Sequence, residues 1–425
     1  MFANGSLVLA DNSYLYLNTD AVTTNENLNV ILADEVKQDG TVNIKGSSGL
    51  WFGYKLTDNI LSAQYDPTSV LLASGLTAPE VTRELLLTGK DTAATATLRS
   101  MISDGNYAGA AAYMNRFASF ANAGAAQVMA FNAVNLVNDA VEEHGSVLAA
   151  YAHERKGLDL WIDVNGFFSK ANKYESGKTN YGYRADLAGT TFGADYSFGN
   201  NFAAGASVSI GKGKSRGRGV GSGVKNRFDY WGVNLYSVWA TPYVNLVGNV
   251  GYLQSKNKIE SHGLKGKPDV NTFSVGIKAE KSFAVTDNFA VTPHIGVRYM
   301  NIDMKRFKTG GFSYSADKGN LAQFPVGVAF NSEIKTAAGV KIKPVLDLEI
   351  APTAGDRKVK NKFGLVGTSA TDTLDTRVAN NALYSAKLSV QANKGGHTFG
   401  LGYRFSGGND GRVDQTLQAK YRYSF

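Results

Sequence analysis

From about Gly157 to Phe425, apolar and polar residues alternate with a period of two, and this pattern restricts the fold more than any other feature. We distinguish twelve such segments. The last sets Val413, Leu417, Ala419, Tyr421, Tyr423 and Phe425 on one face, and Asp414, Thr416, Gln418, Lys420, Arg422 and Ser424 on the other. Because successive side chains of a strand point to opposite faces, these segments are predicted to be β-strands with one apolar and one polar face.

Three other segments separate their faces in the same way. Residues 289–299 set Phe289, Val291, Pro293, Ile295, Val297 and Tyr299 against Thr292, His294, Gly296 and Arg298. Residues 341–350 set Ile342, Pro344, Leu346, Leu348 and Ile350 against Lys341, Lys343, Asp347 and Glu349. Residues 398–405 set Phe399, Leu401, Tyr403 and Phe405 against Thr398, Gly400, Gly402 and Arg404. A strand between lipid and a polar lumen has this pattern.

The connections distinguish a membrane barrel from a soluble sandwich, which also alternates. Short turns are expected at 199–201, 241–242, 286–288, 337–339 and 394–396, and long polar loops at 170–185, 212–227, 255–270, 303–320 and 352–377, with a shorter one at 406–412. Short periplasmic turns and longer external loops are typical of outer-membrane barrels. Aromatic residues at segment ends, such as Phe192, Tyr230, Trp231 and Tyr299, fit an interfacial belt. We therefore predict an all-β, twelve-stranded transmembrane barrel in the bacterial outer membrane.

Three further observations bear on this location. The sequence has no apolar run of roughly 18 residues, so a membrane-spanning part must be a closed barrel. It has no cysteine, as suits an envelope protein, although many cytosolic proteins also lack it. It begins Met1-Phe2-Ala3-Asn4 without the charged and apolar regions of a signal peptide. Since an outer-membrane protein needs that signal, we expect the chain to be part of a longer precursor.

Two regions precede the barrel, which is assigned to residues 157–425. Residues 1–78 contain short alternating runs separated by Asn, Asp and Gly-rich turns, which favours the end of a β-solenoid; a small β-rich cap of another kind is the alternative. Residues 79–156 are rich in Ala, Leu, Asn and Glu, and Pro79, Gly89, Gly105 and Gly124 predict several helices in series.

The last of these helices is expected at about residues 124–143. It carries polar residues at helical spacings of three and four: Asn132, Asn135, Asn138, Asp139, Glu142 and Glu143. So much asparagine is unusual in a soluble helix and suits a narrow helix inside a polar pore.

The order of these parts resembles the autotransporters of type V secretion, over roughly residues 70–425. The stretches 157–161, 188–195 and 230–237 are similar to that family's barrel. The chain end also resembles the outer-membrane assembly signal through Gln418, Tyr421, Tyr423 and Phe425, although Lys420 stands where the signal usually has glycine. The resemblance implies a translocator that is inserted by the β-barrel assembly machinery and exports an N-terminal passenger to the cell surface.

The resemblance also implies that the helix at about 124–143 fills the lumen. A twelve-stranded barrel leaves room for about one helix, since barrel diameter grows with strand number. We hypothesise that Asp139, Glu142 and Glu143 pair with the predicted lumen-facing charges, which are Arg298, Lys341, Lys343, Asp347, Glu349, Arg404, Lys420 and Arg422. Some members of the family cut this helix at an Asn-Asn pair. The sequence has no such pair in this helix, and Asn138-Asp139 is the nearest candidate.

No motif in the sequence points to catalysis, a cofactor or a metal. Gly213 to Gly217 matches G-x-S-x-G but lies in a basic, glycine-rich loop without the strand and helix that a nucleophile elbow requires. The five histidines are scattered and have no cysteine partners, so we expect no zinc site.

The net charge of +8 raises the question of nucleic acid, as does the basic loop with Lys212, Lys214, Arg216, Arg218, Lys225 and Arg227. The loop lacks interleaved aromatics and is predicted to lie outside the cell. There it would meet lipopolysaccharide phosphates, or it is simply a solvated loop.

We therefore expect a monomer whose partners are outer-membrane lipid and lipopolysaccharide, the assembly machinery and its own passenger, with no nucleic acid. The alternative is a porin-like channel whose helical region is a periplasmic domain, and single-channel conductance would separate the two. An outer-membrane enzyme would need an acidic or Ser/His group at one rim, and the sequence shows none.

Overall fold

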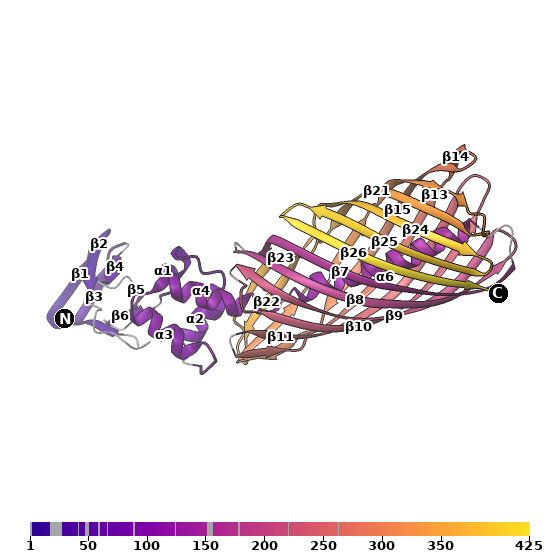
Figure 1. Cartoon of the computed structure of the whole chain (residues 1–425). Helices are drawn as coiled ribbons and strands as arrows, with labels where there is room; N and C mark the ends of the chain where they lie inside the picture. Colours follow the sequence, from indigo (N-terminus) through magenta and orange to yellow (C-terminus); the bar gives the residue numbers. More distant parts are fainter. Residues whose placement is uncertain are drawn as a thin grey trace. The chain divides into compact units, whose positions relative to one another are not determined.

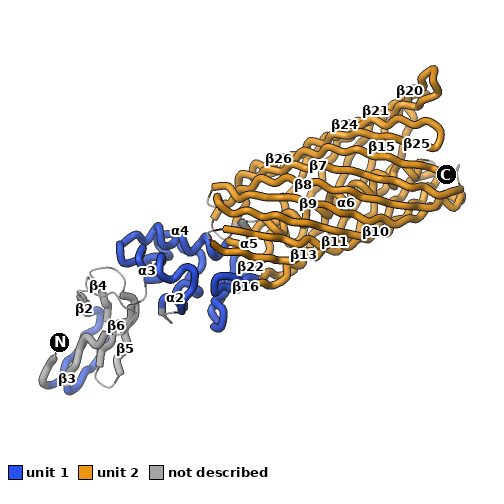
Figure 2. Tube along the Cα trace, turned by 60° about the horizontal axis from the view of Figure 1, so that its bottom comes forward, with its two compact units in different colours: residues 1–119, 308–314, 362–374 blue, residues 120–307, 315–361, 375–425 orange. Residues whose placement is uncertain are grey.

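The computed structural model describes residues 2–17, 28–40, 42–46, 51–57, 60–65, 67–87, 90–123, 125–150, 156–176, 179–219, 221–261 and 263–425. These residues form two compact units (Figure 2). Unit 1 comprises residues 1–119, 308–314 and 362–374, and unit 2 comprises residues 120–307, 315–361 and 375–425. Each unit is described in turn.

Unit 2 is a closed antiparallel barrel. Its wall consists of β7 (Lys156–Ser176), β8 (Thr179–Phe198), β9 (Phe202–Gly219), β10 (Lys225–Ala240), β11 (Asn245–Ser261), β13 (Asp269–Glu280) with β14 (Phe283–Thr286), β15 (Phe289–Met304), β18 (Gly319–Gln323) with β19 (Val326–Ser332) and β20 (Ile334–Lys335), β21 (Lys341–Gly355), β24 (Ala382–Lys394), β25 (His397–Gly408) and β26 (Arg412–Ser424). The last strand closes the ring on the first, with Tyr421 opposite Ile162 and Val413 opposite Lys170. The twelve-stranded barrel predicted from the alternation is confirmed.

The two faces of the wall have opposite chemistry, as the period-two pattern predicts. Apolar side chains of the outward face are strongly exposed; for example, Leu401 is 65% and Leu388 63% exposed. Polar side chains of the inward face, such as Asp163, Ser209 and Thr272, are buried. This is the reverse of a soluble protein, in which a large exposed apolar band would be unstable in water.

The connections at the two ends of the barrel are unequal, but the predicted long loops were wrong in part. β7 and β8 continue to Ser176 and from Thr179, so most of the expected loop at 170–185 is strand. The segments 212–227 and 255–270 likewise are largely strand, with β12 (Leu264–Gly266) between β11 and β13. The polar residues of these segments continue the backbone pairing of the wall. The change from apolar to polar residues therefore coincides with the end of the apolar band and not with the end of the strands. The end of the barrel that carries the segments 170–185, 212–227 and 255–270 is called the loop end, and the opposite end is called the turn end.

Among its described residues, unit 1 begins with six strands: β1 (Phe2–Leu9), β2 (Ser13–Leu17), β3 (Leu28–Gln38), β4 (Val42–Gly46), β5 (Trp51–Thr57) and β6 (Ile60–Tyr65). β1 pairs with β3 and β2 with β4 in parallel, at separations of about thirty residues, such as Phe2 opposite Leu32. Parallel pairing between successive chain segments is the arrangement of a solenoid coil. β6 pairs antiparallel with β3 and β5.

Four helices follow in the described part of unit 1: α1 (Thr68–Ala73), α2 (Pro79–Leu87), α3 (Thr95–Ser103) and α4 (Tyr107–Ala118). The helical region therefore begins before the predicted residue 79. Gly105, with φ +69°, separates α3 from α4 as predicted, whereas Gly89 and Gly124 lie outside the described residues.

The core of unit 1 includes residues from two segments that lie between barrel strands in the sequence. These segments contain parts of β16 (Phe307–Thr309), β17 (Phe312–Ala316), β22 (Lys358–Leu365) and β23 (Thr371–Arg377). Phe312 packs against Phe117 and Phe363, with ring centroids 5.4 and 5.0 Å apart. The Asp372 carboxylate accepts hydrogen bonds from the backbone N–H groups of Glu80 (3.1 Å) and Val81 (2.8 Å) at the start of α2.

Unit 2 also contains α5 (Phe120–Ala123) and α6 (Ala126–Ala149), and α6 runs inside the barrel (Figure 1). The predicted end of this helix near Glu143 was too early. Helix propensity falls at Gly145, but packing inside the barrel favours continuation to Ala149. Among the described residues, no helix has both the length and the apolar character needed to cross a membrane.

Candidate functional site in the barrel lumen

α6 passes along the lumen from the loop end to the turn end. Near its start, Ala125 and Val128 line a small cavity with Tyr174 and Tyr181, which belong to the hairpin ends of β7 and β8. At its end, Ala149 and Ala150 line a cavity with Thr241 and Pro242 of a short turn. Most of the helix is buried, including its polar residues Asn132, Asn138 and Glu142. The chain preceding α6 therefore leaves the lumen at the loop end.

The helix packs on one side of the lumen, along β8, β9, β10, β11, β13 and β15. Near the turn end this contact is apolar and tight: Leu148 and Ala149 cluster with Ala203, Val238 and Val247. A Cβ atom on Gly145 would lie 2.5 Å from Cγ1 of Val247, so only glycine fits here without displacement. The absence of a side chain thus lets α6 approach β11 closely.

Charged side chains connect the acidic face of α6 with the barrel wall. Arg298 on β15 donates from Nε and Nη2 to the Glu142 carboxylate, at 2.7 and 2.6 Å, and its Nη2 lies 2.7 Å from the Asp139 carboxylate. From the other side of the lumen, Arg404 on β25 bonds to Asp139 and to Glu143, the latter at 3.1 Å. Lys387 on β24 and Lys420 on β26 both bond to Glu143. Ion pairs removed from water in this way are strong and sensitive to the loss of one partner.

A second contact couples α6 to the wall through aromatic rings. His144 Nε2 lies 2.6 Å from a carboxylate oxygen of Asp195 on β8, and Tyr236 on β10 donates to the same oxygen at 2.8 Å. The indole N–H of Trp161 on β7 donates to the Tyr236 hydroxyl at 2.6 Å, and the His144 ring stacks on Trp161 with centroids 4.4 Å apart. These four side chains fix the rotation of the helix about its axis.

A third contact lies toward the loop end. Arg412 on β26 donates to the side-chain oxygen of Asn132 at 2.7 Å, and it also bonds to Asp414 and Asn380. Asn138 accepts from Ser274 on β13 at 3.3 Å. The side-chain amides of α6 therefore serve as hydrogen-bond partners for a polar wall.

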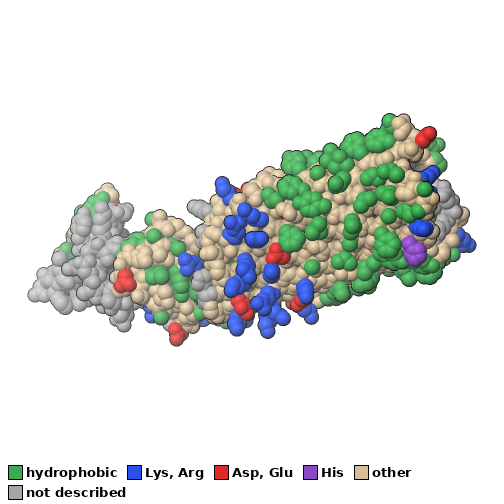
Figure 3. Space-filling view, in the orientation of Figure 1, with side chains coloured by type: hydrophobic (Ala, Val, Ile, Leu, Met, Phe, Trp, Pro, Cys, Tyr) green, Lys and Arg blue, Asp and Glu red, His purple; other side chains and the backbone are tan. Residues whose placement is uncertain are grey.

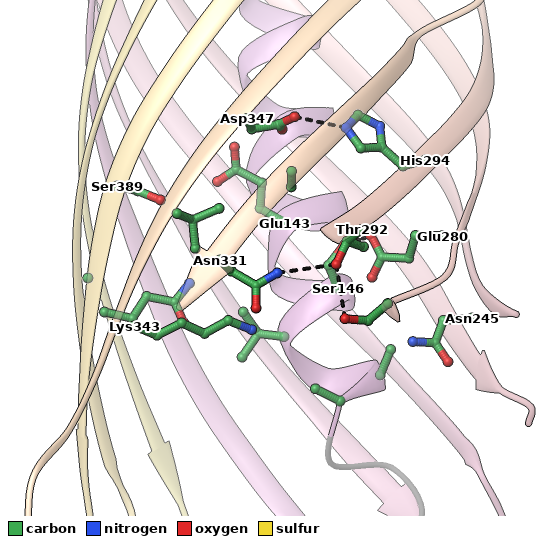
Figure 4. A pocket seen from close by; sticks show the side chains of 18 of the residues that line it. Glu143, Ser146, Asn245, Glu280, Thr292, His294, Asn331, Lys343, Asp347 and Ser389 are labelled. Atoms are coloured by element: carbon green, nitrogen blue, oxygen red, sulfur yellow. Dashed lines mark hydrogen bonds and ion pairs between the residues drawn. The ribbon is translucent and has the colours of Figure 1, made fainter. Parts of the chain in front are cut away.

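A cavity of about 530 Å³ remains beside the last turns of α6, at the turn end (Figure 4). Its wall carries Lys343, Asn331, Ser389 and Asn245, and the His294–Asp347 pair at 2.9 Å. On the helix side, Ser146 donates to Glu280 at 2.8 Å, and Glu280 pairs with Lys278. The lumen is thus filled along β8 to β15 and partly open beside β19 to β26.

The remaining candidate residues lie elsewhere in the site. Lys341 is exposed at the first position of β21, Lys343 and Asp347 line the large cavity, and Glu349 lines a smaller one with Asn135. Arg422 donates to Thr398 at 3.4 Å and lines a cavity with His144.

The candidate assembly residues belong to the closing strand and its C-terminal end. Gln418 faces the lumen and donates to Asp163 at 2.8 Å. Tyr421 contacts His397 and Phe399, whereas the Tyr423 ring lies 4.7 Å from that of Phe425. The Phe425 N–H donates to the Leu158 carbonyl at 3.0 Å, so the last residue takes part in closing the ring.

Sequence reasoning missed Lys387, Arg412 and the cluster around His144. Lys387 and Arg412 share the inward parity of their strands, so the alternation of 382–394 and 412–424 contained the necessary signal. The His144 cluster joins residues up to about ninety positions apart, and no local pattern indicates it. In the described part of the chain, no group of three or more His, Cys, Asp or Glu side chains is arranged to hold a metal.

Comparison with family models identifies one family. The family model described as Autotransporter beta-domain matches residues 160–404, more than half of the chain. The transport unit of the autotransporter AIDA-I from Escherichia coli has the same fold: the TM-score is 0.51 at 14% identity, with 67% of this chain and 98% of that chain covered.

Two curated relatives are named outer membrane protein A. Those of Rickettsia conorii and Rickettsia rickettsii are 24% and 25% identical over 148 residues, which are 31% of this chain and 7% of each relative. This chain therefore spans only a small part of their length. The extent of the family match, together with the closed barrel, is decisive: the chain belongs to the autotransporter β-domain family, and its barrel is an outer-membrane translocator domain.

Proposed function

We propose that the barrel anchors this chain in the outer membrane and that the residues preceding α6 are the exported part, held at the cell surface. The observation that carries the proposal is the path of α6. The helix enters the lumen at the loop end and ends at the turn end, where β7 begins. Since short turns of outer-membrane barrels face the periplasm, the N-terminal part of the chain lies on the external side.

The contacts of α6 support a retained plug. Three acidic side chains of the helix pair with four basic side chains of the wall, and Gly145 packs closely against β11. Such an arrangement holds the end of the exported chain firmly once export is complete. We infer that residues 1–78 are the C-terminal end of the passenger, that 79–156 link it to the barrel and that 157–425 form the translocator.

Several finer expectations belong to the same proposal. Gln418, Tyr421, Tyr423 and Phe425 would be recognised by the β-barrel assembly machinery, because the strand that they occupy closes the ring. The barrel would act as a monomer, since all its strands pair within one chain. We expect no catalytic activity, cofactor or nucleic-acid partner in residues 157–425.

Surface labelling of intact cells tests the proposal. One epitope tag is placed at the N-terminus of the chain, behind a signal peptide, and a matched tag is placed in the turn at residues 336–340. The N-terminal tag should bind antibody in intact cells, whereas the turn tag should bind only after the outer membrane is opened. A porin-like channel with a periplasmic helical domain predicts the opposite result for the N-terminal tag and would refute the proposal.

A further inference from the structure

The outward face of the barrel carries a dense group of basic side chains near the loop end. It comprises Lys170, Arg184, Lys212, Lys214, Arg216, Arg218, Lys225, Arg227, Lys256 and Lys258, all exposed, on β7 to β11. We call this group the basic patch. In Figure 3, most Lys and Arg side chains of the visible barrel wall gather near one end, whereas many apolar side chains are spread over the rest of it. The patch plays no part in the lumen contacts.

Strand register arranges the patch in rows. In the first of these rows, Lys170 lies opposite Arg184, Arg184 opposite Arg216, and Arg216 opposite Lys225. Four cations thus occupy directly opposed positions on four neighbouring strands. Directly opposed side chains lie about 5 Å apart at Cβ, and like charges at that spacing destabilise a sheet.

The next row repeats the arrangement with Lys214, Arg227 and Lys258, followed toward the turn end by a row with Lys212 and Lys256. The acidic side chains in these rows are Asp186, Asp229, Glu260 and Asp269, so nine of the ten patch cations share their rows with four anions, and Arg218 lies opposite Gly182. Only one ion pair within the patch is seen among the described residues, Lys214 with Asp186 at 3.4 Å. The protein itself therefore leaves most of this positive charge unbalanced.

The rows beyond the patch show where it lies relative to lipid. The adjoining row contains Val164, Ile210 and Trp231, and the row after it contains Phe192, Val208 and Val233. Val164, Ile210, Phe192 and Val208 are each about half exposed, as expected for side chains that face hydrocarbon. Trp231 occupies the border, which is the usual place of an interfacial tryptophan. In the orientation proposed above, on which this inference rests, the basic patch begins where the apolar band ends on the external side, at the height of lipid headgroups.

We propose that the basic patch binds the phosphate groups of a phosphorylated glycolipid of the outer leaflet. Arginine and lysine in opposed rows supply several donors to one phosphate, and guanidinium groups bind phosphate through paired hydrogen bonds. The lipid's acyl chains would lie along the apolar rows below, so that one molecule meets both surfaces. Binding relieves the repulsion within the rows.

The test uses the full chain in phosphatidylcholine nanodiscs, with or without diphosphorylated lipid A. The patch variant carries Lys170→Gln, Arg184→Gln, Arg216→Gln and Lys225→Gln. The control variant carries the same change in net charge at the turn end, through Lys156→Gln, Lys335→Gln, Lys341→Gln and Lys394→Gln, all of which are exposed. Mass spectrometry of the intact complex measures the lipid A bound, and thermal unfolding measures stability in each disc.

The patch variant should bind lipid A at least tenfold more weakly than the wild type, whereas the control variant should bind like the wild type. Without lipid A, the patch variant should unfold at the same or a higher temperature than the wild type, because it lacks the repulsion. With lipid A, the wild type should gain stability and the patch variant should not. The patch variant is thus expected to be at least as stable as the wild type without lipid A and less stable than it with lipid A. Its stability without lipid A also shows that the patch variant folds.

Two further arms identify the source of the phosphate. Dephosphorylated lipid A should bind the wild type no better than it binds the patch variant, and inorganic phosphate should not reproduce the gain in stability. Equal lipid A binding by the patch and control variants would overturn the proposal. So would wild-type binding of dephosphorylated lipid A that is as tight as that of diphosphorylated lipid A, or a gain in stability from inorganic phosphate as large as that from lipid A.

Discussion

At the scale of single residues, buried ion pairs attach α6 to the barrel wall. Glu142 and Arg298 are 4% and 8% exposed, so neither is well solvated when its partner is removed. Asp139 remains 2.7 Å from Arg298 and provides partial compensation. The attachment of α6 therefore depends on each buried charge having its partner, and less on the net charge of the lumen.

Glu142→Gln should therefore loosen α6 by about 3 kcal/mol, near the lower end of the range for breaking a buried ion pair. Hydrogen exchange of the α6 amides measures this loss directly. The double variant Glu142→Gln, Arg298→Met should recover most of it, because both buried charges are then absent. Asp303→Asn, which breaks an exposed pair with Lys305, should leave the exchange of the α6 amides unchanged. Equal effects at the buried and exposed pairs would contradict this interpretation.

A second residue-scale prediction concerns pH and Asp372 in unit 1. Burial raises the pKa of this carboxyl above its ordinary value, although the backbone N–H groups of Val81 and Glu80 oppose the shift. The folded unit thus binds the proton more tightly than the unfolded chain, so acidification stabilises it and the gain is lost as pH rises through the folded pKa. Relative to Asp372→Asn, the wild type should show more protection of α2 amides at pH about 4 than at pH 7, after correction for intrinsic exchange. The raised pKa of Asp372 would be refuted if the ratio of α2 amide protection in the wild type to that in Asp372→Asn stayed constant or fell on acidification.

At the scale of elements, the alternation predicted the strands and their two faces well, because a period of two depends only on neighbouring residues. Arg298 and Arg404, placed inward by parity alone, are among the side chains that contact α6. The extent of the strands was not predictable in the same way. Lys214 and Arg227 were assigned to a loop, yet they face each other in paired strands, because backbone hydrogen bonds continue beyond the apolar band. Contacts such as His144 with Asp195 depend on the closed ring and leave no trace in local sequence.

The close approach of α6 to β11 gives an element-scale prediction. Gly145→Val places a branched side chain against the stiff, fully buried Val247, and overpacking of this kind costs about 1–3 kcal/mol. Exchange of the amides in the last turns of α6 should accelerate correspondingly. Gly407→Val is the matched control, since a Cβ atom there meets nothing within 4 Å. Unchanged exchange in Gly145→Val would mean that the helix is not packed against β11 in solution.

At the scale of the whole molecule, the account rests on a barrel whose lumen is occupied by its own chain. The helix fills the side along β8 to β15, and a cavity of about 530 Å³ remains at the turn end. The apolar outer face and the closed ring make a membrane the only surroundings that satisfy every part of the wall. An open channel and a plugged translocator share this wall and differ only in α6.

Single-channel conductance in a planar bilayer tests that difference most directly. The full chain should conduct little, because α6 and its ion pairs obstruct the lumen. A chain that begins after Ala150, and so lacks α6, should fold into the same barrel and conduct several-fold more. Equal, large conductance of the two chains would contradict the account, because it would show that the lumen is open with α6 present.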